Sequence, residues 1–202
     1  MEQTLSKQPI ARVCVFCGSN TGRDERYTRA AEQLGRLLAQ RHITVVYGGG
    51  RVGLMGVVAD AALEAGGDVI GVIPRALDTR ELAHDGLTEM HVVETMHQRK
   101  ALMADLSDGF VALPGGLGTG DEFFEIVTWA QLGIHHKPCA LLNVAGFFDP
   151  LIEYLDHCVD QGFVWPEHRR LVLVARHPAD VLEQMYAYQP PNVERWIKRA
   201  EV

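Results

Sequence analysis

Short apolar runs alternate along the chain with longer amphipathic segments. The short runs are rich in β-branched residues, and most stop at Gly or Pro, as buried strands of a parallel sheet do. They span 12–16, 44–47, 68–73, 90–93, 109–113 and 139–142, with a further candidate at 171–174. Between them, apolar residues recur every three or four positions, which predicts helices. These span 24–41, 54–64, 96–106, 121–132, 150–160 and 178–187.

This alternation predicts the fold class α/β, with a doubly wound parallel sheet in a Rossmann-like three-layer arrangement. No linker interrupts the pattern, so we expect a single domain over 1–202 with peripheral tails at about 1–10 and 190–202. Ligands of such sheets bind beyond the carboxyl ends of the strands. Glycines follow three of the predicted strands, at Gly18, 48–50 and 115–118. We expect all three clusters on the same edge of the sheet.

The composition of the chain excludes or disfavours several classes of function. The chain is 47% hydrophobic and 22% charged, which excludes a disordered chain, and its formal net charge is −7. An acidic chain is a poor nucleic-acid binder, so an anionic ligand must meet a local cluster of donors. No apolar run approaches the roughly 18 residues that span a bilayer, and the N-terminus has no apolar signal segment. We therefore expect a cytoplasmic protein that binds neither nucleic acid nor membrane.

Four cysteines are present, two of them as Cys14-x-x-Cys17. That spacing occurs in redox and zinc sites, but a structural zinc needs four ligands and no second pair follows. Buried thiols at Cys14, Cys17, Cys139 and Cys158 are the simpler interpretation. We expect no metal site.

The segment Gly48-x-Gly50-x-x-Gly53 matches the dinucleotide-binding fingerprint. It follows the second predicted strand rather than the first, and the acidic residue about twenty positions on, Asp68, begins a strand instead of ending one. Two other roles stay open: a tight turn with close helix packing, or an approach of backbone N–H groups to a nucleotide.

The sharpest feature is Pro114-Gly115-Gly116-Leu117-Gly118-Thr119-Gly120-Asp121-Glu122. It follows an apolar strand and leads into the helix predicted from Asp121. Glycine-rich backbone at a helix N-terminus presents N–H donors and the positive end of the helix dipole, and the Thr119 hydroxyl adds a donor, so a phosphate site is predicted. Thr119-x-x-Glu122 also fits a capping box, which would give these residues a second, structural role.

A second capping box at Thr95-Met96-His97-Gln98 places Arg99 and Lys100 near the start of a helix. Cations at this end oppose the helix dipole. The pair therefore indicates an anionic partner, with a solvated charge pair as the alternative.

Met96-His97-Gln98-Arg99-Lys100 together with the glycine-rich segment resembles the paired motifs of the LONELY GUY family. These are cytokinin riboside 5′-monophosphate phosphoribohydrolases, also labelled lysine decarboxylase-like. The likeness spans nearly the whole chain and includes Phe16-Cys17-Gly18-Ser19, Tyr47-Gly48-Gly49-Gly50, Val72-Ile73-Pro74 and Thr128-Trp129-Ala130-Gln131-Leu132-Gly133. One departure is Gly120-Asp121, where the family commonly has Leu-Glu; we expect Gly120 to loosen the first helical turn.

The resemblance implies hydrolysis of the N-glycosidic bond of an adenine-type nucleoside 5′-monophosphate, without a cofactor, to free base and ribose 5-phosphate. It implies that Arg99 and Glu122 are catalytic, and an ionised carboxylate suits an oxocarbenium-like transition state. It also implies a homodimer or higher homo-oligomer, with Met103, Trp129 and Leu132 near the interface. The expected substrate contacts are Ser19, Gly49, Glu81, Lys100, Gly115, Gly116, Gly118, Thr119 and Thr128.

Other functions remain as alternatives. Amino-acid decarboxylation needs a lysine Schiff base to pyridoxal phosphate with an acidic partner, and the lysines here offer at most one plausible site residue. A non-catalytic nucleotide-binding protein or sensor would use both motifs equally well. A glutamate beside a phosphate loop repels an anionic ligand, however, which favours an enzyme. The base stays open, since plain AMP would make the chain an AMP nucleosidase.

Overall fold

The computed structural model describes residues 10–78 and 82–191, so most of both predicted tails lies outside it. Within the described residues, seven strands form one sheet in the order β4-β3-β2-β1-β5-β6-β7, and every neighbouring pair runs parallel. The strands are β1 (Arg12–Phe16), β2 (Thr44–Tyr47), β3 (Val69–Pro74), β4 (Glu89–Val93), β5 (Gly109–Ala112), β6 (Cys139–Leu142) and β7 (Val172–Ala175).

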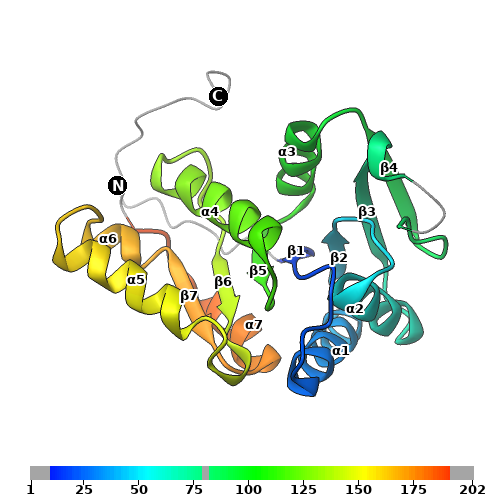
Figure 1. Ribbon diagram of the computed structural model, residues 1–202, viewed down its shortest axis with the longest axis horizontal. Coiled ribbons are helices and arrows are strands. Elements are labelled where there is room, and N and C mark those ends of the chain that lie inside the picture. The colour runs from blue at the N-terminus through cyan, green and yellow to red at the C-terminus, as the bar shows by residue number, and fades with distance from the viewer. Residues whose placement is uncertain (1–9, 79–81, 192–202) are drawn as a thin grey trace, which may run out of the picture.

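Helices cover both faces of this sheet. On one face lie α1 (Glu25–Gln40), α2 (Gly53–Glu64) and α7 (Pro178–Ala187), and on the other lie α3 (Met96–Leu106), α4 (Leu117–Gln131) and α5 (Asp149–Asp160). Figure 1 shows α3 and α4 along one side of the strands and α1 and α2 along the other. Alternate residues of β1 enter the two cores: Val13 and Val15 face α1 and α2, while Cys14 and Phe16 face α3 and α4. The predicted three-layer α/β fold is confirmed.

The local sequence explains how closely α1 and α2 approach each other. Asp24 caps α1 by accepting a hydrogen bond from the Arg26 N–H at 2.9 Å. Ala31, Leu34 and Leu38 then form its buried stripe. At Gly35 a Cβ atom would lie 2.4 Å from the Val58 carbonyl oxygen of α2, so glycine permits this close contact.

The chain order places the carboxyl ends of β1 and β5 side by side. From β1 the chain moves through β2 and β3 to β4 at one edge, then returns through α3 to β5 on the other side of β1. The Gly18 N–H donates to the Pro114 carbonyl oxygen at 3.0 Å and joins the loops after these two strands. Gly18, Gly48 and Gly115 all lie at the carboxyl edge, as predicted, and the reversal between β1 and β5 is where such sheets bind ligands.

Two details differ from the sequence-based expectation. Helix α4 begins at Leu117, not at Asp121, because Gly116 already has the non-helical conformation of an N-cap and the following glycines are helical. A helical glycine costs only about 1 kcal/mol relative to alanine, so the glycine-rich loop ends earlier than its composition indicates. The short helix α6 (Pro166–Arg169) and the 3₁₀ turns η1 (Arg75–Leu77) and η2 (Val144–Gly146) were not predicted, since segments of three or four residues carry no periodicity.

Candidate functional site

A hollow of about 210 Å³ opens at the carboxyl ends of β1 and β5. It brings together three expected substrate contacts, Ser19, Gly115 and Gly116. Tyr27 of α1 and Phe147 form one wall, with their rings edge to face at 5.6 Å between centroids. The other lining residues are Gly18, Asn20, Thr21, Gly22, Leu54 and Pro114.

The N-terminus of α4 stands at the edge of this hollow. Gly116 is the N-cap and has no side chain to satisfy the first-turn N–H groups, which lack intrahelical partners. Thr119 is 5% exposed, and its Oγ1 packs back on Gly115, where a Cβ atom would lie 2.1 Å away. Free N–H donors and a positive helix end make this a suitable phosphate site, in a position that only glycine allows.

The predicted capping box at Thr119 and Glu122 is wrong. Thr119 is the third residue of α4, so its N–H is already inside the first turn and Gly116 takes the N-cap position. The capping box at the start of α3 is confirmed: the Gln98 N–H donates to Thr95 Oγ1 and the Thr95 N–H donates to Gln98 Oε1, both at 3.2 Å. The Glu122 carboxylate is therefore free of a capping role.

Glu122 pairs instead with Arg99 across the gap between α4 and α3. The distance from Arg99 Nη1 to Glu122 Oε1 is 3.2 Å, and the two side chains are only 11% and 9% exposed. Arg99 Nε also donates to the Val72 carbonyl oxygen of β3 at 3.1 Å. At Gly48 a Cβ atom would lie 1.9 Å from Arg99 Nη2, so the glycine after β2 makes room for the guanidinium.

Burial and the neighbouring charges change the pKa of Glu122. Burial raises the pKa of Glu122, the Arg99 guanidinium partly offsets this, and the nearby Asp121 carboxylate raises the pKa further. A carboxylate with a raised pKa is a better proton acceptor than an ordinary surface glutamate, and it is suited to act as a general base.

Lys100, the neighbour of Arg99 in α3, is held by two carboxylates of α4. Its Nζ lies 3.1 Å from Asp121 Oδ2 and 3.1 Å from Glu125 Oε2, and its side chain is 10% exposed. Burial acts to lower the pKa of Lys100, but the two carboxylates outweigh it and the net shift is upward. The alternative of a solvated Arg99–Lys100 pair is wrong, because the two side chains are only 11% and 10% exposed.

The other expected substrate contacts are not all gathered here. Gly49 follows β2 at this edge and has φ of 72°, a conformation that favours glycine. Gly118 is exposed in the first turn of α4. Thr128 is exposed on α4 nine residues after Thr119, roughly 13 Å farther along the helix axis. Glu81 lies outside the described residues.

The glycines of the fingerprint-like segment make close packing contacts. At Gly53, which has φ of 61°, a Cβ atom would lie 2.2 Å from the backbone carbon of Ser19. At Gly50 it would lie 2.7 Å from Met55 Cε. Of the alternatives left open by the sequence, these contacts support the packing role.

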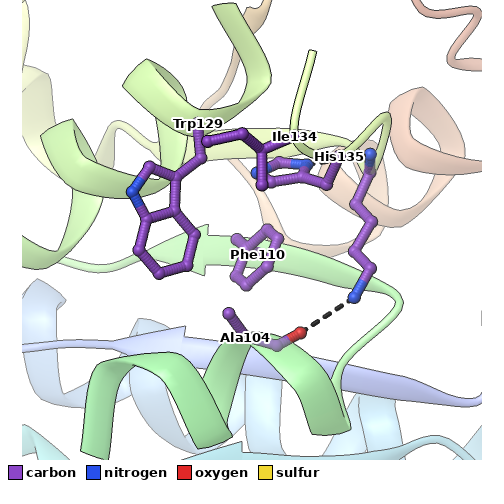
Figure 2. A pocket seen from close by; sticks show the side chains of 6 residues that line it. Ala104, Phe110, Trp129, Ile134 and His135 are labelled. Carbon is purple, nitrogen blue, oxygen red and sulfur yellow. Dashed lines mark hydrogen bonds between the residues drawn. The ribbon is translucent and has the colours of Figure 1, made fainter. Parts of the chain in front are cut away.

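A second hollow of about 10 Å³ lies between α3, α4 and β5 (Figure 2). Lys137 Nζ donates to the Ala104 carbonyl oxygen at 2.8 Å near the end of α3, and Trp129 and Phe110 close the space. Burial lowers the pKa of His135 to about 4, so this ring is neutral at pH 7. The hollow has room for about one water molecule and is a packing feature.

All four cysteines are free thiols, and the expected burial is confirmed for Cys14, Cys17 and Cys139. It is wrong for Cys158, which is only partly buried. Burial is the main cause that raises the pKa of Cys14 and Cys17. Met103 is 1% exposed in the core of its own chain, so its side chain is not available for contact with a partner subunit.

Within residues 10–78 and 82–191, no three His, Cys, Asp or Glu side chains gather as metal ligands, and no helix could span a membrane.

Sequence reasoning missed three parts of the site. The Val72 carbonyl oxygen accepts a hydrogen bond from Arg99, and Gly48 makes room for its guanidinium. No pattern in the sequence indicates either role. Glu125 was overlooked, although its spacing of three residues from Glu122 and four from Asp121 places all three on neighbouring positions of one helix. The aromatic wall of the larger hollow joins two distant segments and has no local pattern.

Comparisons with known proteins find relatives that cover most of this chain. A family model described as "Possible lysine decarboxylase" matches residues 55–185. A cytokinin riboside 5′-monophosphate phosphoribohydrolase of Rhodococcoides fascians is 53% identical over 81% of this chain and 83% of its own length. An enzyme of the same name from Arabidopsis thaliana is 48% identical over 94% of this chain and 87% of its own length.

Solved structures share the fold. A molybdenum cofactor binding protein of Rippkaea orientalis matches with a TM-score of 0.67 and 23% identity over 87% of this chain and 95% of its own. The molybdenum cofactor carrier protein of Chlamydomonas reinhardtii matches with a TM-score of 0.65 and 26% identity, over 88% of this chain and 98% of its own.

Proposed function

We propose that this chain, which belongs to the family of the cytokinin riboside 5′-monophosphate phosphoribohydrolases, is a nucleotide hydrolase. The model of this family carries the description "Possible lysine decarboxylase". The enzyme hydrolyses the N-glycosidic bond of a cytokinin riboside 5′-monophosphate and releases free base and ribose 5-phosphate. The observation that carries this proposal is the Arg99–Glu122 pair, 3.2 Å apart and only 11% and 9% exposed, with Glu122 in the second turn of a helix whose N-terminus is suited to phosphate.

The phosphate end of the substrate is assigned to the start of α4. Gly115, Gly116, Gly118 and Thr119 supply backbone N–H groups there, and Thr119 adds its hydroxyl; Ser19 also lines the hollow. Binding energy at the phosphate then positions the distant glycosidic bond, which is how remote groups of a substrate accelerate a reaction.

Glu122 acts at the sugar. Its carboxylate stabilises positive charge at C1′ as the C1′–N bond breaks, and it accepts a proton from the attacking water. The water oxygen bonds to C1′, the electrons of the broken bond go to the base, and a proton ends on the base nitrogen. Arg99 holds the carboxylate in place through the contact at 3.2 Å, and Val72 holds Arg99.

Lys100, Gly49, Glu81 and Thr128 complete the proposed set of substrate contacts. The family resemblance supports all four. Lys100 lies beside the catalytic pair, and Gly49 lies at the same sheet edge. Thr128 is exposed on α4, away from the hollow of its own chain, so its contact with substrate needs a longer reach than the others require.

The proposal extends to the assembly and setting of the protein. We propose one domain over 1–202 that acts as a homodimer or higher homo-oligomer in the cytoplasm, with neither nucleic acid nor membrane as a partner. The family resemblance supports an oligomer, free buried thiols suit a reducing compartment, and the net charge of −7 disfavours nucleic acid.

A second candidate is a binding or carrier protein without turnover. The likeness to the molybdenum cofactor carrier of Chlamydomonas reinhardtii favours it, because that protein has the same fold at 26% identity. The buried Glu122 argues against it, since a carboxylate close to a phosphate site weakens the binding of an anion.

Product analysis separates these functions. The protein is incubated with AMP and with isopentenyladenosine 5′-monophosphate, and the mixture is resolved by chromatography. Free adenine or isopentenyladenine supports the hydrolase, and their relative rates distinguish an AMP nucleosidase from a cytokinin-forming enzyme. Nucleotide binding in calorimetry without release of base identifies a carrier or sensor.

A further inference from the structure

Helices α3 and α4 meet through a compact group of opposite charges. Two cations of α3, Arg99 and Lys100, face three carboxylates of α4, Asp121, Glu122 and Glu125. The group therefore holds one more negative than positive charge if all five are ionised. Asp121 is 62% exposed, so water screens its charge, while the other four side chains are 9–24% exposed.

Glu125 is the carboxylate that simple neutralisation does not require. Asp121 Oδ2 already accepts a hydrogen bond from Lys100 Nζ at 3.1 Å. Glu125 Oε2 lies at the same distance from that ammonium, yet this buried oxygen lacks an aligned hydrogen bond. Its side chain is 24% exposed, so it is held close to the ammonium rather than released into water.

We propose that Glu125 is a positioning residue of the hydrolytic site. Together with Asp121 it binds Lys100, and this contact keeps α3 and α4 in the register that places Glu122 against Arg99. Asp121 and Glu125 are four residues apart and share one face of α4, so the ammonium bridges them. Arg99 is the neighbour of Lys100 in α3, so this contact also fixes the position of the guanidinium. The inference rests on the proposed function of Arg99 and Glu122.

Burial is the main cause that raises the pKa of Glu122, and the charges of this group modify that pKa. The charged or titratable groups near it in the described chain are Arg99 and Lys100 of α3, Asp121 and Glu125 of α4, and the buried thiols of Cys14 and Cys17. The two cations lower the pKa of Glu122, while the two carboxylates raise it. Removal of a carboxylate and removal of the ammonium therefore shift this pKa in opposite directions.

The test compares Glu125→Gln, Asp121→Asn and Lys100→Gln with the parent over a range of pH. For Glu125→Gln we expect kcat to fall about 10-fold, because the catalytic pair loses its register, while KM does not rise because the site becomes less negative. The acid limb of its kcat/KM profile moves down by about 0.5–1 pH unit, because a charge that disfavours the ionised Glu122 is gone. Asp121→Asn moves the limb in the same direction by less, since Asp121 is 62% exposed. Lys100→Gln moves it upward.

The matched control is Glu153→Gln on α5, an exposed glutamate with the same change of charge. It leaves kcat and the pH profile as in the parent. A merely structural role for Glu125 predicts a lower melting temperature with an unmoved acid limb, and that result overturns the proposal. A shift of the same sign in Glu125→Gln and Lys100→Gln overturns it as well.

A measurement without turnover separates this inference from the proposed function. The carboxyl carbon of Glu122 is titrated by ¹³C NMR in the parent and in Glu125→Gln, with Glu122→Gln used to assign the resonance. A lower midpoint in Glu125→Gln shows that an ionised Glu125 is held close to Glu122, as the proposal requires, even if the parent releases no base. An unchanged midpoint refutes it even if the parent is an active hydrolase.

Discussion

Replacement of Glu122 by glutamine separates its chemistry from its contribution to stability. The carboxylate does not cap α4, so its structural role is confined to the contact with Arg99 Nη1 at 3.2 Å. Glutamine keeps the shape and an oxygen that accepts from the guanidinium. It removes the negative charge at the sugar and the base that activates water.

The two effects have different magnitudes. A hydrogen bond between charged groups contributes about 1.5–3 kcal/mol and one with a neutral partner about 0.5–1.5 kcal/mol, so the substitution costs about 1 kcal/mol. For a chain of this size, that corresponds to a fall in Tm of about 2–4 °C. General-base catalysis contributes typically 10²- to 10⁴-fold, so we expect base release to slow by at least about 100-fold.

The assay follows free base by chromatography under single-turnover conditions, with Tm from circular dichroism and nucleotide affinity from calorimetry. Glu153→Gln, an exposed glutamate of α5, serves as the control for a lost charge and keeps parental turnover. We expect Glu122→Gln to bind AMP and remain folded while it loses turnover. Turnover close to that of the parent would refute the catalytic role and leave Glu122 as the ion-pair partner of Arg99 alone.

Three further perturbations follow from the geometry. Gly48→Ala places a Cβ atom 1.9 Å from Arg99 Nη2 and displaces the guanidinium, so kcat should fall at least about 10-fold while far-ultraviolet circular dichroism stays unchanged; parental kcat would contradict this. At Gly120 of α4 an added Cβ atom meets open space, and alanine is favoured over glycine in a helix by about 1 kcal/mol. Gly120→Ala should therefore raise Tm by about 2–4 °C. A lower Tm would contradict this and show that the alanine is strained at this position. Because burial raises the pKa of Glu122 and the reaction needs its ionised form, kcat/KM should decline on the acid side at a higher pH than an ordinary glutamate, near 4.5, would cause. An acid limb at or below that value in a pH–rate profile would mean that the carboxylate is not desolvated during catalysis.

The sequence predicted the layers of the fold because strand burial and helix amphipathicity are local patterns. All seven expected strands, including the candidate at 171–174, and six helices are found close to their expected positions. The glycines after β1, β2 and β5 share one edge because parallel strands end together. The start of α4 was placed four residues late, since composition does not distinguish a glycine that caps a helix from one inside it.

The candidate site was predicted less completely, for a physical reason. Arg99 and Glu122 were identified through motifs, yet their contact depends on the distance between α3 and α4, which no local pattern encodes. The capping box at Thr119 was wrong, because the same residue types serve caps and phosphate loops and only backbone conformation separates the two. The role of Gly48 follows from a close approach between distant segments, so it is visible only in three dimensions.

The most direct test of the central claim compares a nucleotide with its own nucleoside. kcat/KM is measured for isopentenyladenosine 5′-monophosphate and for isopentenyladenosine, and ribose 5-phosphate is quantified beside the free base. If the N-terminus of α4 binds the phosphate and Glu122 acts at C1′, the nucleotide is cleaved at least about 100-fold more efficiently, with base and ribose 5-phosphate in equal amounts. Comparable values for the two compounds, or release of nucleoside and inorganic phosphate instead of base, would contradict the account.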